Sequence, residues 1–210
     1  VATTKAYSAQ LSALYLISVK IARVRGLISI GDERALCAEL QRLPECIEQT
    51  LGCQSDMQRI ATLYANRSSV FFLGRGLDYA AALEASLKLK EFYIHSEAYA
   101  AGELKHGTIS LIEEGTLVVA LATQPALFEK TVSNIREVVA RGASVVLVTT
   151  DDFTGDESVC QHIVRLPKCL YEFSASLSII PMQLLAYYIA VERNCDVDKP
   201  RNLAKSVTVE

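Results

Sequence analysis

The sequence predicts an α/β fold: a three-layer sandwich with a four- to five-stranded parallel sheet, preceded by a helical N-terminal extension. Two observations predict it. The first third of the chain has helical periodicity, and short runs that are apolar throughout then alternate with longer helical stretches. Strands without polar alternation are buried on both faces, which is typical of a parallel sheet covered by helices.

The helical extension comes first along the chain. Over residues 3–25 apolar side chains recur at steps of three and four positions, and Gly26 follows, as a helix terminus prefers. A second helix is expected over residues 32–43, with Asp32 as its N-cap and Pro44 as its interruption. Further helical segments are expected at residues 45–51 and 55–65.

The sheet follows this extension. Strands are expected at residues 68–76, 116–123, 144–150 and 162–167. Helices are expected at residues 78–94, 125–141 and 178–194. Parallel strands need right-handed crossovers, and such a sheet places its ligand beyond the carboxyl ends of the strands.

The composition excludes several classes of protein. The chain has 210 residues, of which 50% are hydrophobic and 21% are charged, as in a soluble globular protein. Its net charge of −3 provides no basic face for nucleic acid. No apolar run reaches the roughly 18 residues of a membrane span, and no basic flank precedes a hydrophobic stretch at the N-terminus. We therefore expect a cytoplasmic protein.

Six cysteines are scattered along the chain without CxxC or cysteine–histidine pairs. We expect them to be reduced thiols, because neither a disulfide framework nor a zinc site has this spacing. The sequence therefore supports no metal and no cofactor. The first residue is not methionine and the chain runs straight into a helix, so we expect a piece of a longer polypeptide.

A glycine motif, Gly74-Arg75-Gly76, ends the first expected strand and leads into a helix. Glycine lets the backbone approach a ligand, and the start of a helix offers unpaired N–H groups to an anion. The full dinucleotide fingerprint would need another glycine where Tyr79 stands. The motif is equally consistent with a tight strand-to-helix turn and with a ligand loop, and a nucleotide binder is the weakest hypothesis.

The helix after this turn carries Glu84, Lys88 and Glu91 on one face, because they are four and three residues apart. A solvated ladder of ion pairs is the ordinary interpretation of such a face. The alanines and leucines around it bury much of this helix, however. A partly buried carboxylate beside a lysine is suited to act as a general base.

The segment "SEAYAAGELKHG" (96–107) is expected to be a loop. Its charged or titratable residues are Glu97, Glu103, Lys105 and His106. Packing alone does not explain so many polar residues among small ones, although a polar surface loop is an equally weighted alternative. His106 could move a proton near neutral pH. We assign structural positions to His95, at the end of a helix, and to His162, at the start of a strand.

The segment "DVDKPRNLAKSVTVE" (196–210) closes the chain without periodicity, and Lys205 stands in it among small and β-branched residues. Chain ends usually fray, and a frayed end needs no particular sequence, so a single amine placed in such a segment indicates that the tail fits somewhere.

Several stretches together resemble one family. The stretch "ALEASLKLKEFYIHSEAYAAGELKHG" and the closing tail are similar to the sugar-isomerase half of glutamine:fructose-6-phosphate amidotransferase, or glucosamine-6-phosphate synthase. Four further stretches fit in order: "VATTKAYSAQL", "FFLGRG", "SNIREVVARG" and "PMQLLAYYIAVERNCDVD". The resemblance covers essentially the whole chain and implies the flavodoxin-like SIS fold.

The resemblance also implies a division of the chain. Residues 1–67 would be helices from the end of the first SIS subdomain and the connector, 68–195 the second SIS subdomain, and 196–210 a C-terminal catalytic tail. The glutaminase domain and the loops that hold the sugar phosphate would lie upstream. Fructose 6-phosphate or glucosamine 6-phosphate and a second copy of the chain, in a homodimer, are the implied partners.

Roles for individual residues are implied by position. Lys205 would form a Schiff base with the open-chain ketose, and Glu91 would move a proton between C1 and C2 of the sugar. His106 would act in ring opening at a neighbouring subunit's site, and Lys88 would lie near the amination step. Backbone contacts with the sugar are implied for Val1 and Ala204.

One residue is missing relative to the family. Two residues usually separate the helix glutamate from the tyrosine of Tyr-x-His, whereas Phe92 alone separates Glu91 from Tyr93. One residue corresponds to about 100° of helix rotation. Either the helix ends a turn early, or the register of Glu91 is altered.

Two functions from different classes stay open. Conversion of fructose 6-phosphate and ammonia to glucosamine 6-phosphate would use a carboxylate, an imidazole and an amine together. On this hypothesis the isolated chain is inactive, because half of the sugar pocket lies elsewhere. A non-catalytic sugar-phosphate-binding module of the same fold would require none of these three groups.

Overall fold

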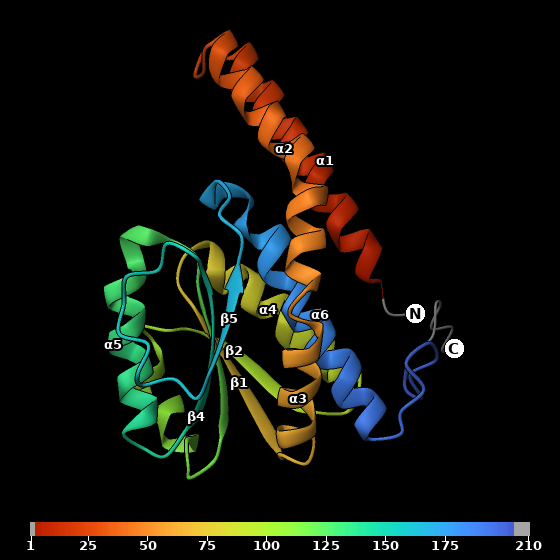
Figure 1. Cartoon of the computed structure of the whole chain (residues 1–210), viewed down its shortest axis with the longest axis vertical. Helices are drawn as coiled ribbons and strands as arrows, with labels where there is room; N and C mark the ends of the chain where they lie inside the picture. Colours follow the sequence, from red (N-terminus) through yellow and green to blue (C-terminus); the bar gives the residue numbers. More distant parts are fainter. Residues whose placement is uncertain (1–2, 204–210) are drawn as a thin grey trace, which may run out of the picture.

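The computed structural model describes residues 3–203, which form a five-stranded parallel sheet between layers of helices (Figure 1). The order of the strands in the sheet is β2-β1-β3-β4-β5. The strands are β1 (Ser69–Gly74), β2 (His95–Ala100), β3 (Leu117–Ala122), β4 (Ser144–Thr150) and β5 (His162–Leu166). The α-helices are α1 (Thr4–Val24), α2 (Ile30–Leu51), α3 (Gln54–Tyr64), α4 (Leu77–Lys90), α5 (Phe128–Val139) and α6 (Ser174–Glu192). The predicted fold class is confirmed.

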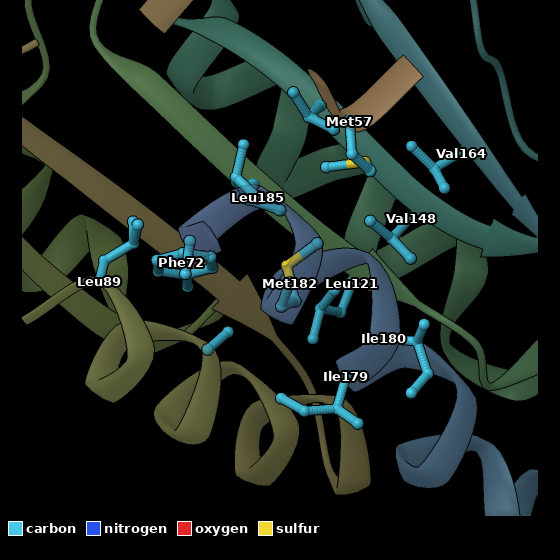
Figure 2. Close-up of a cluster of buried hydrophobic side chains, with 14 of the residues drawn as sticks. Met57, Phe72, Leu89, Leu121, Val148, Val164, Ile179, Ile180, Met182 and Leu185 are labelled. Atoms are coloured by element: carbon cyan, nitrogen blue, oxygen red, sulfur yellow. The ribbon is translucent and has the colours of Figure 1, made fainter. Parts of the chain in front are cut away.

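The sheet is buried on both faces, as the unbroken apolar strands predict. Successive side chains of a strand point to opposite faces, so Phe72 and Phe71 of β1 belong to two different core clusters. The first cluster lies between the sheet and α3, α4 and α6, where Met57, Phe72 and Leu185 are in view (Figure 2). The second lies between the sheet and α5.

Helix α6 is the most apolar helix of the described part of the chain. The stretch Tyr171–Glu192 is long and apolar enough to cross a membrane by length and composition, although the sequence has no uninterrupted apolar run of that length. Within the fold, 67% of its apolar window is buried. It lies against α2, α3 and α4, so its composition is explained by its place in the core (Figure 1).

Helices α1 and α2 form an antiparallel hairpin that projects from the body of the molecule (Figure 1). The expected N-cap of the second helix is wrong. Ser29 is the N-cap, and Asp32 is its partner in a capping box, in which each side chain accepts from the other's backbone N–H. The expected interruption at Pro44 is also wrong, since α2 continues to Leu51. Buried Leu43 and Cys46 hold the helix against the core on both sides of the proline.

The segment expected as a loop at residues 96–107 begins as a strand. Residues His95–Ala100 form β2, which pairs with β1 along its whole length at the edge of the sheet. Alternate burial of Ser96 and Ala98 in the core explains why this polar sequence is extended. The helix expected to reach residue 94 ends at Lys90, and His95 therefore begins a strand instead of ending a helix.

Candidate active site

Helix α4 carries a buried cluster of three charged side chains. Lys88 is only 4% exposed, and its Nζ lies 2.9 Å from Oε1 of Glu91 and 3.3 Å from Oε1 of Glu84. The two carboxylates are themselves largely buried. The sequence predicts the shared face, and the structure shows that it is not a solvated ladder. A buried lysine between two carboxylates has its charge compensated, which makes its burial tolerable.

The local sequence explains why α4 can bury this cluster. Ala81, Ala82 and Ala85 present no bulk, so the helix packs closely on β1, β2 and α6. Leu89 anchors the last turn in the first core cluster. The ionic face is therefore held against the body of the protein in a fixed orientation.

Helix α4 ends immediately after the cluster in a Schellman motif. The N–H of Ile94 donates to the carbonyl of Leu89, and the N–H of Tyr93 donates to that of Lys90. Glu91 keeps right-handed helical geometry, with φ −57°, and so stays on the face of Lys88. The helix thus ends at Lys90, before the residue 94 expected from the sequence, and Glu91 still pairs with Lys88.

One oxygen of the Glu91 carboxylate has no hydrogen-bond partner in the described part of the chain. Oε1 accepts from Lys88, whereas Oε2 is buried and has no hydrogen-bond partner among residues 3–203. Buried polar atoms are nearly always paired in folded proteins, so a free carboxylate oxygen in such a place is suited to a ligand.

The cluster lies at the amino end of the sheet, because α4 leads from the end of β1 back to the start of β2, and not beyond the carboxyl ends where the sequence predicts a ligand. Two other segments meet α4 at this amino end. Burial raises the pKa of Tyr7 in α1 to about 12, and the negative charge of Glu84 adds to the effect. After α6, Arg201 stacks on the ring of Tyr93 at 5.0 Å. A cleft of about 440 Å³ lies beside Tyr93. Its other lining residues are Arg193, Asn194, Cys195, Asp196, Lys199 and Arg201.

His106 lies at the opposite end of the sheet. Glu91 precedes β2 and His106 follows it, in the short 3₁₀ helix Leu104–His106 (η1), and a six-residue strand spans about 20 Å. The imidazole is exposed, as are Glu103 and Lys105. Within one chain the structure therefore does not bring His106 to the Lys88–Glu91 pair.

The glycine motif after β1 forms a tight turn into α4. A Cβ on Gly74 would lie 2.4 Å from the backbone of Asp78, so only glycine fits there. The Asp78 carboxylate is buried and accepts from the backbone N–H and the hydroxyl of Thr123. Arg75 donates twice to Asn134 in α5. These contacts account for the motif as a turn that joins the ends of β1 and β3.

The comparisons with known proteins agree with this fold. A model of the SIS domain matches residues 63–193. The chain belongs to the SIS domain family. Over its whole length this SIS chain is 54% identical to a glutamine–fructose-6-phosphate aminotransferase (isomerizing) from Caldanaerobacter subterraneus and 50% identical to one from Clostridium tetani. It spans only 35% of the length of either relative.

A solved structure gives the same result. The C-terminal domain of glucosamine-fructose-6-phosphate aminotransferase from Francisella tularensis superposes with a TM-score of 0.89 and 32% identity. The match covers 93% of this SIS chain and 56% of the solved one. The resemblance read from the sequence is confirmed at the level of family and fold.

Three predicted site residues lie outside the described part of the chain, and the sequence predicted no role for two residues that the structure brings into contact. Lys205, Val1 and Ala204 fall outside the described residues, so their predicted roles stay predictions. Sequence reasoning missed Tyr93 and Arg201. The signal for Tyr93 in the sequence is its place directly after the end of a helix, where the backbone often adopts a left-handed conformation that tyrosine disfavours.

Proposed function

We propose that this SIS chain is the C-terminal part of an isomerase domain that converts fructose 6-phosphate and glutamine-derived ammonia to glucosamine 6-phosphate, a step of hexosamine biosynthesis. Similarity along the whole chain to aminotransferases with that name supports the proposal. The observation that carries it is the buried Lys88–Glu91 pair with its free carboxylate oxygen. A binding module has no need of such a group.

In this proposal each named residue has one chemical task. The Lys205 amine condenses with the C2 ketone of the opened sugar and releases water, and ammonia then takes its place at C2. The unpaired oxygen of Glu91 accepts the proton from C1 and returns it to C2, while the proton of the C1 hydroxyl passes to the nitrogen at C2, so that no net proton is consumed. Lys88 holds that carboxylate in position and lies beside the amination step.

The remaining contacts complete the assignment. His106 opens the sugar ring at the site of a second copy of the chain, in a homodimer. The backbones of Val1 and Ala204 contact the sugar. Residues 1–67 end the first SIS subdomain and connect it to the second, at 68–195, and residues 196–210 are the catalytic tail. The glutaminase and the rest of the first subdomain belong to the same cytoplasmic polypeptide.

Trapping of the covalent intermediate tests the proposal. Full-length protein is incubated with fructose 6-phosphate and borohydride, and the labelled peptide is identified by mass spectrometry. We expect the label on Lys205 and its loss in Lys205→Arg, which keeps the charge but forms no Schiff base under these conditions. Normal glucosamine 6-phosphate production by Lys205→Arg would refute the mechanism.

An assay of the isolated chain tests the division. The 210-residue piece is supplied with fructose 6-phosphate and ammonia, and we expect no turnover because the rest of the sugar pocket is upstream. Clear turnover would show that the pocket is complete without it. Tight binding of the sugar phosphate to the piece by calorimetry would instead favour the non-catalytic module.

A further inference from the structure

Tyr93 has a backbone conformation that tyrosine rarely adopts. Its φ of +64° lies in the left-handed region, at the position of the Schellman motif that glycine usually occupies. Among the described residues only Asn194 is another non-glycine residue with positive φ, and asparagine tolerates that conformation. Such strain persists where the surroundings fix the residue, so the tyrosine side chain is the feature to explain.

The ring of Tyr93 has one specific partner. The guanidinium of Arg201 lies 5.0 Å from the ring centroid, a stacking geometry in which the ring attracts the cation. The hydroxyl, in contrast, is buried without a hydrogen-bond partner among residues 3–203. The ring, and not the hydroxyl, therefore makes the contact that distinguishes this residue.

The segment that carries Arg201 is folded back onto the body of the protein. Oδ1 of Asp196 accepts from the N–H groups of Asp198 and Lys199 and closes a turn. Val197 packs against the first core cluster, and Pro200 is buried. Arg201 is the last residue of this segment with a described side-chain contact to the body, and Lys205 follows four residues later.

We propose that Tyr93 is a positioning residue, whose ring holds Arg201 and thereby fixes the segment that precedes Lys205. The proposal rests on the proposed function, because it matters for catalysis only if Lys205 carries the Schiff base. It links two parts of the site: Tyr93 lies two residues after Glu91, so one helix end orients both the carboxylate and the tail. The missing residue after Glu91 brings the tyrosine directly to that helix end.

The first experiment measures the docking of the tail alone. Amide hydrogen exchange of residues 196–203 is followed in the full-length protein and in Tyr93→Leu, Arg201→Met and the double variant. We expect each single variant to accelerate exchange about two- to fivefold, the strength of an exposed cation–π contact. The double variant should be no faster than either single one, because both remove the same contact.

Two control variants accompany the exchange measurement. Tyr93→Phe keeps the ring and should restore wild-type exchange, whereas Lys199→Met removes a neighbouring tail charge that makes no ring contact and should change nothing. Arg201 is exposed, so its variant tests the contact even if Tyr93→Leu folds poorly. Unchanged exchange in Arg201→Met, effects that multiply in the double variant, or loss with Tyr93→Phe would each overturn the proposal.

The second experiment measures the catalytic consequence. The rate of borohydride trapping at Lys205 should fall by the same two- to fivefold factor in Tyr93→Leu and Arg201→Met, with KM for fructose 6-phosphate unchanged. If the wild type traps at another lysine, the proposed function fails while the exchange data still decide the contact. If exchange responds but trapping at Lys205 does not, the positioning role is refuted and the proposed function stands.

Discussion

The two ends of the sheet place the candidate catalytic groups in different surroundings. At the amino end, Lys88 and Glu91 are buried, fixed by the end of α4 and adjoined by α1 and the segment after α6. At the carboxyl end, His106 stands exposed on a short 3₁₀ turn. The first end holds a buried carboxylate paired with a lysine, and the second presents an imidazole outward.

Nearness in sequence is therefore a poor guide to a shared site in this chain. Glu91 and His106 are separated by a single strand in the chain, yet that strand carries the backbone from one end of the sheet to the other. In the proposed function, a site that uses both groups draws them from two copies of the chain.

Mixing two inactive variants tests whether the ends cooperate across subunits. Glu91→Gln and His106→Gln in the full-length protein should each lower turnover by about 10²- to 10⁴-fold, the contribution of a general acid or base. When the two are unfolded together and refolded, half of the dimers are mixed and one of their two sites is intact, so about a quarter of wild-type turnover should return. Each variant refolded alone is the control. No recovery in the mixture would place both groups in one chain's site.

Lysine substitutions on α4 test the burial of the amino-end cluster. Lys88→Met leaves two buried carboxylates without their cation and should lower the free energy of unfolding by about 3–5 kcal/mol. Lys90→Met is the matched control, because its side chain is 45% exposed and 3.8 Å from Glu97, and should change it by less than about 0.5 kcal/mol. If urea denaturation shows equal losses of unfolding free energy in the two variants, Lys88 is no more buried than Lys90.

At the carboxyl end, the buried Asp78 predicts a pH dependence of stability. Burial raises the pKa of this carboxyl, while hydrogen bonds from Thr123 oppose the rise. A group whose pKa is higher in the folded state adds stability below its unfolded value of about 4, and this is lost as pH rises through the folded value. Urea unfolding from pH 4 upward should therefore show a falling component that Asp78→Asn removes. An unchanged slope in that variant would contradict the assignment.

At the amino end, His162 predicts a smaller dependence of opposite sign. Burial lowers the pKa of this imidazole, whose Nε2 lies 3.3 Å from the hydroxyl of Tyr64. Its contribution to stability is present above the unfolded value of about 6.5 and is lost as pH falls through the folded value. His162→Gln should flatten that acid-side loss between pH 7 and 5. If the variant keeps the wild-type slope, another group is responsible.

Much of the fold was available from the sequence because burial on both faces leaves a clear pattern. The run that contains Phe71 and Phe72 predicts a buried strand without any knowledge of its neighbours. Strand β2 was not predicted, because an edge strand with half-exposed polar residues reads like a loop until β1 is there to pair with it. The helix break predicted at Pro44 is wrong for a related reason: packing of the residues on both sides outweighs the local tendency of proline to end a helix.

The candidate site was predictable in its parts and not in its arrangement. The spacing of Lys88 and Glu91 fixed their shared face, but whether that face meets solvent depends on helices elsewhere in the chain. The role of Tyr93 depends on a backbone angle and on a partner more than a hundred residues away. Neither is encoded in the local pattern.

The projecting hairpin of α1 and α2 is expected to unfold locally before the rest of the molecule. Around Gly26 the two helices have little beyond each other to contact, and a Cβ at Gly26 would meet no atom within 4 Å. Because opening of this tip breaks few apolar contacts, it costs only a fraction of the free energy of global unfolding. In the isolated chain a protease would therefore nick the tip, where Arg23 and Arg25 offer cleavage points, while the sheet stays folded.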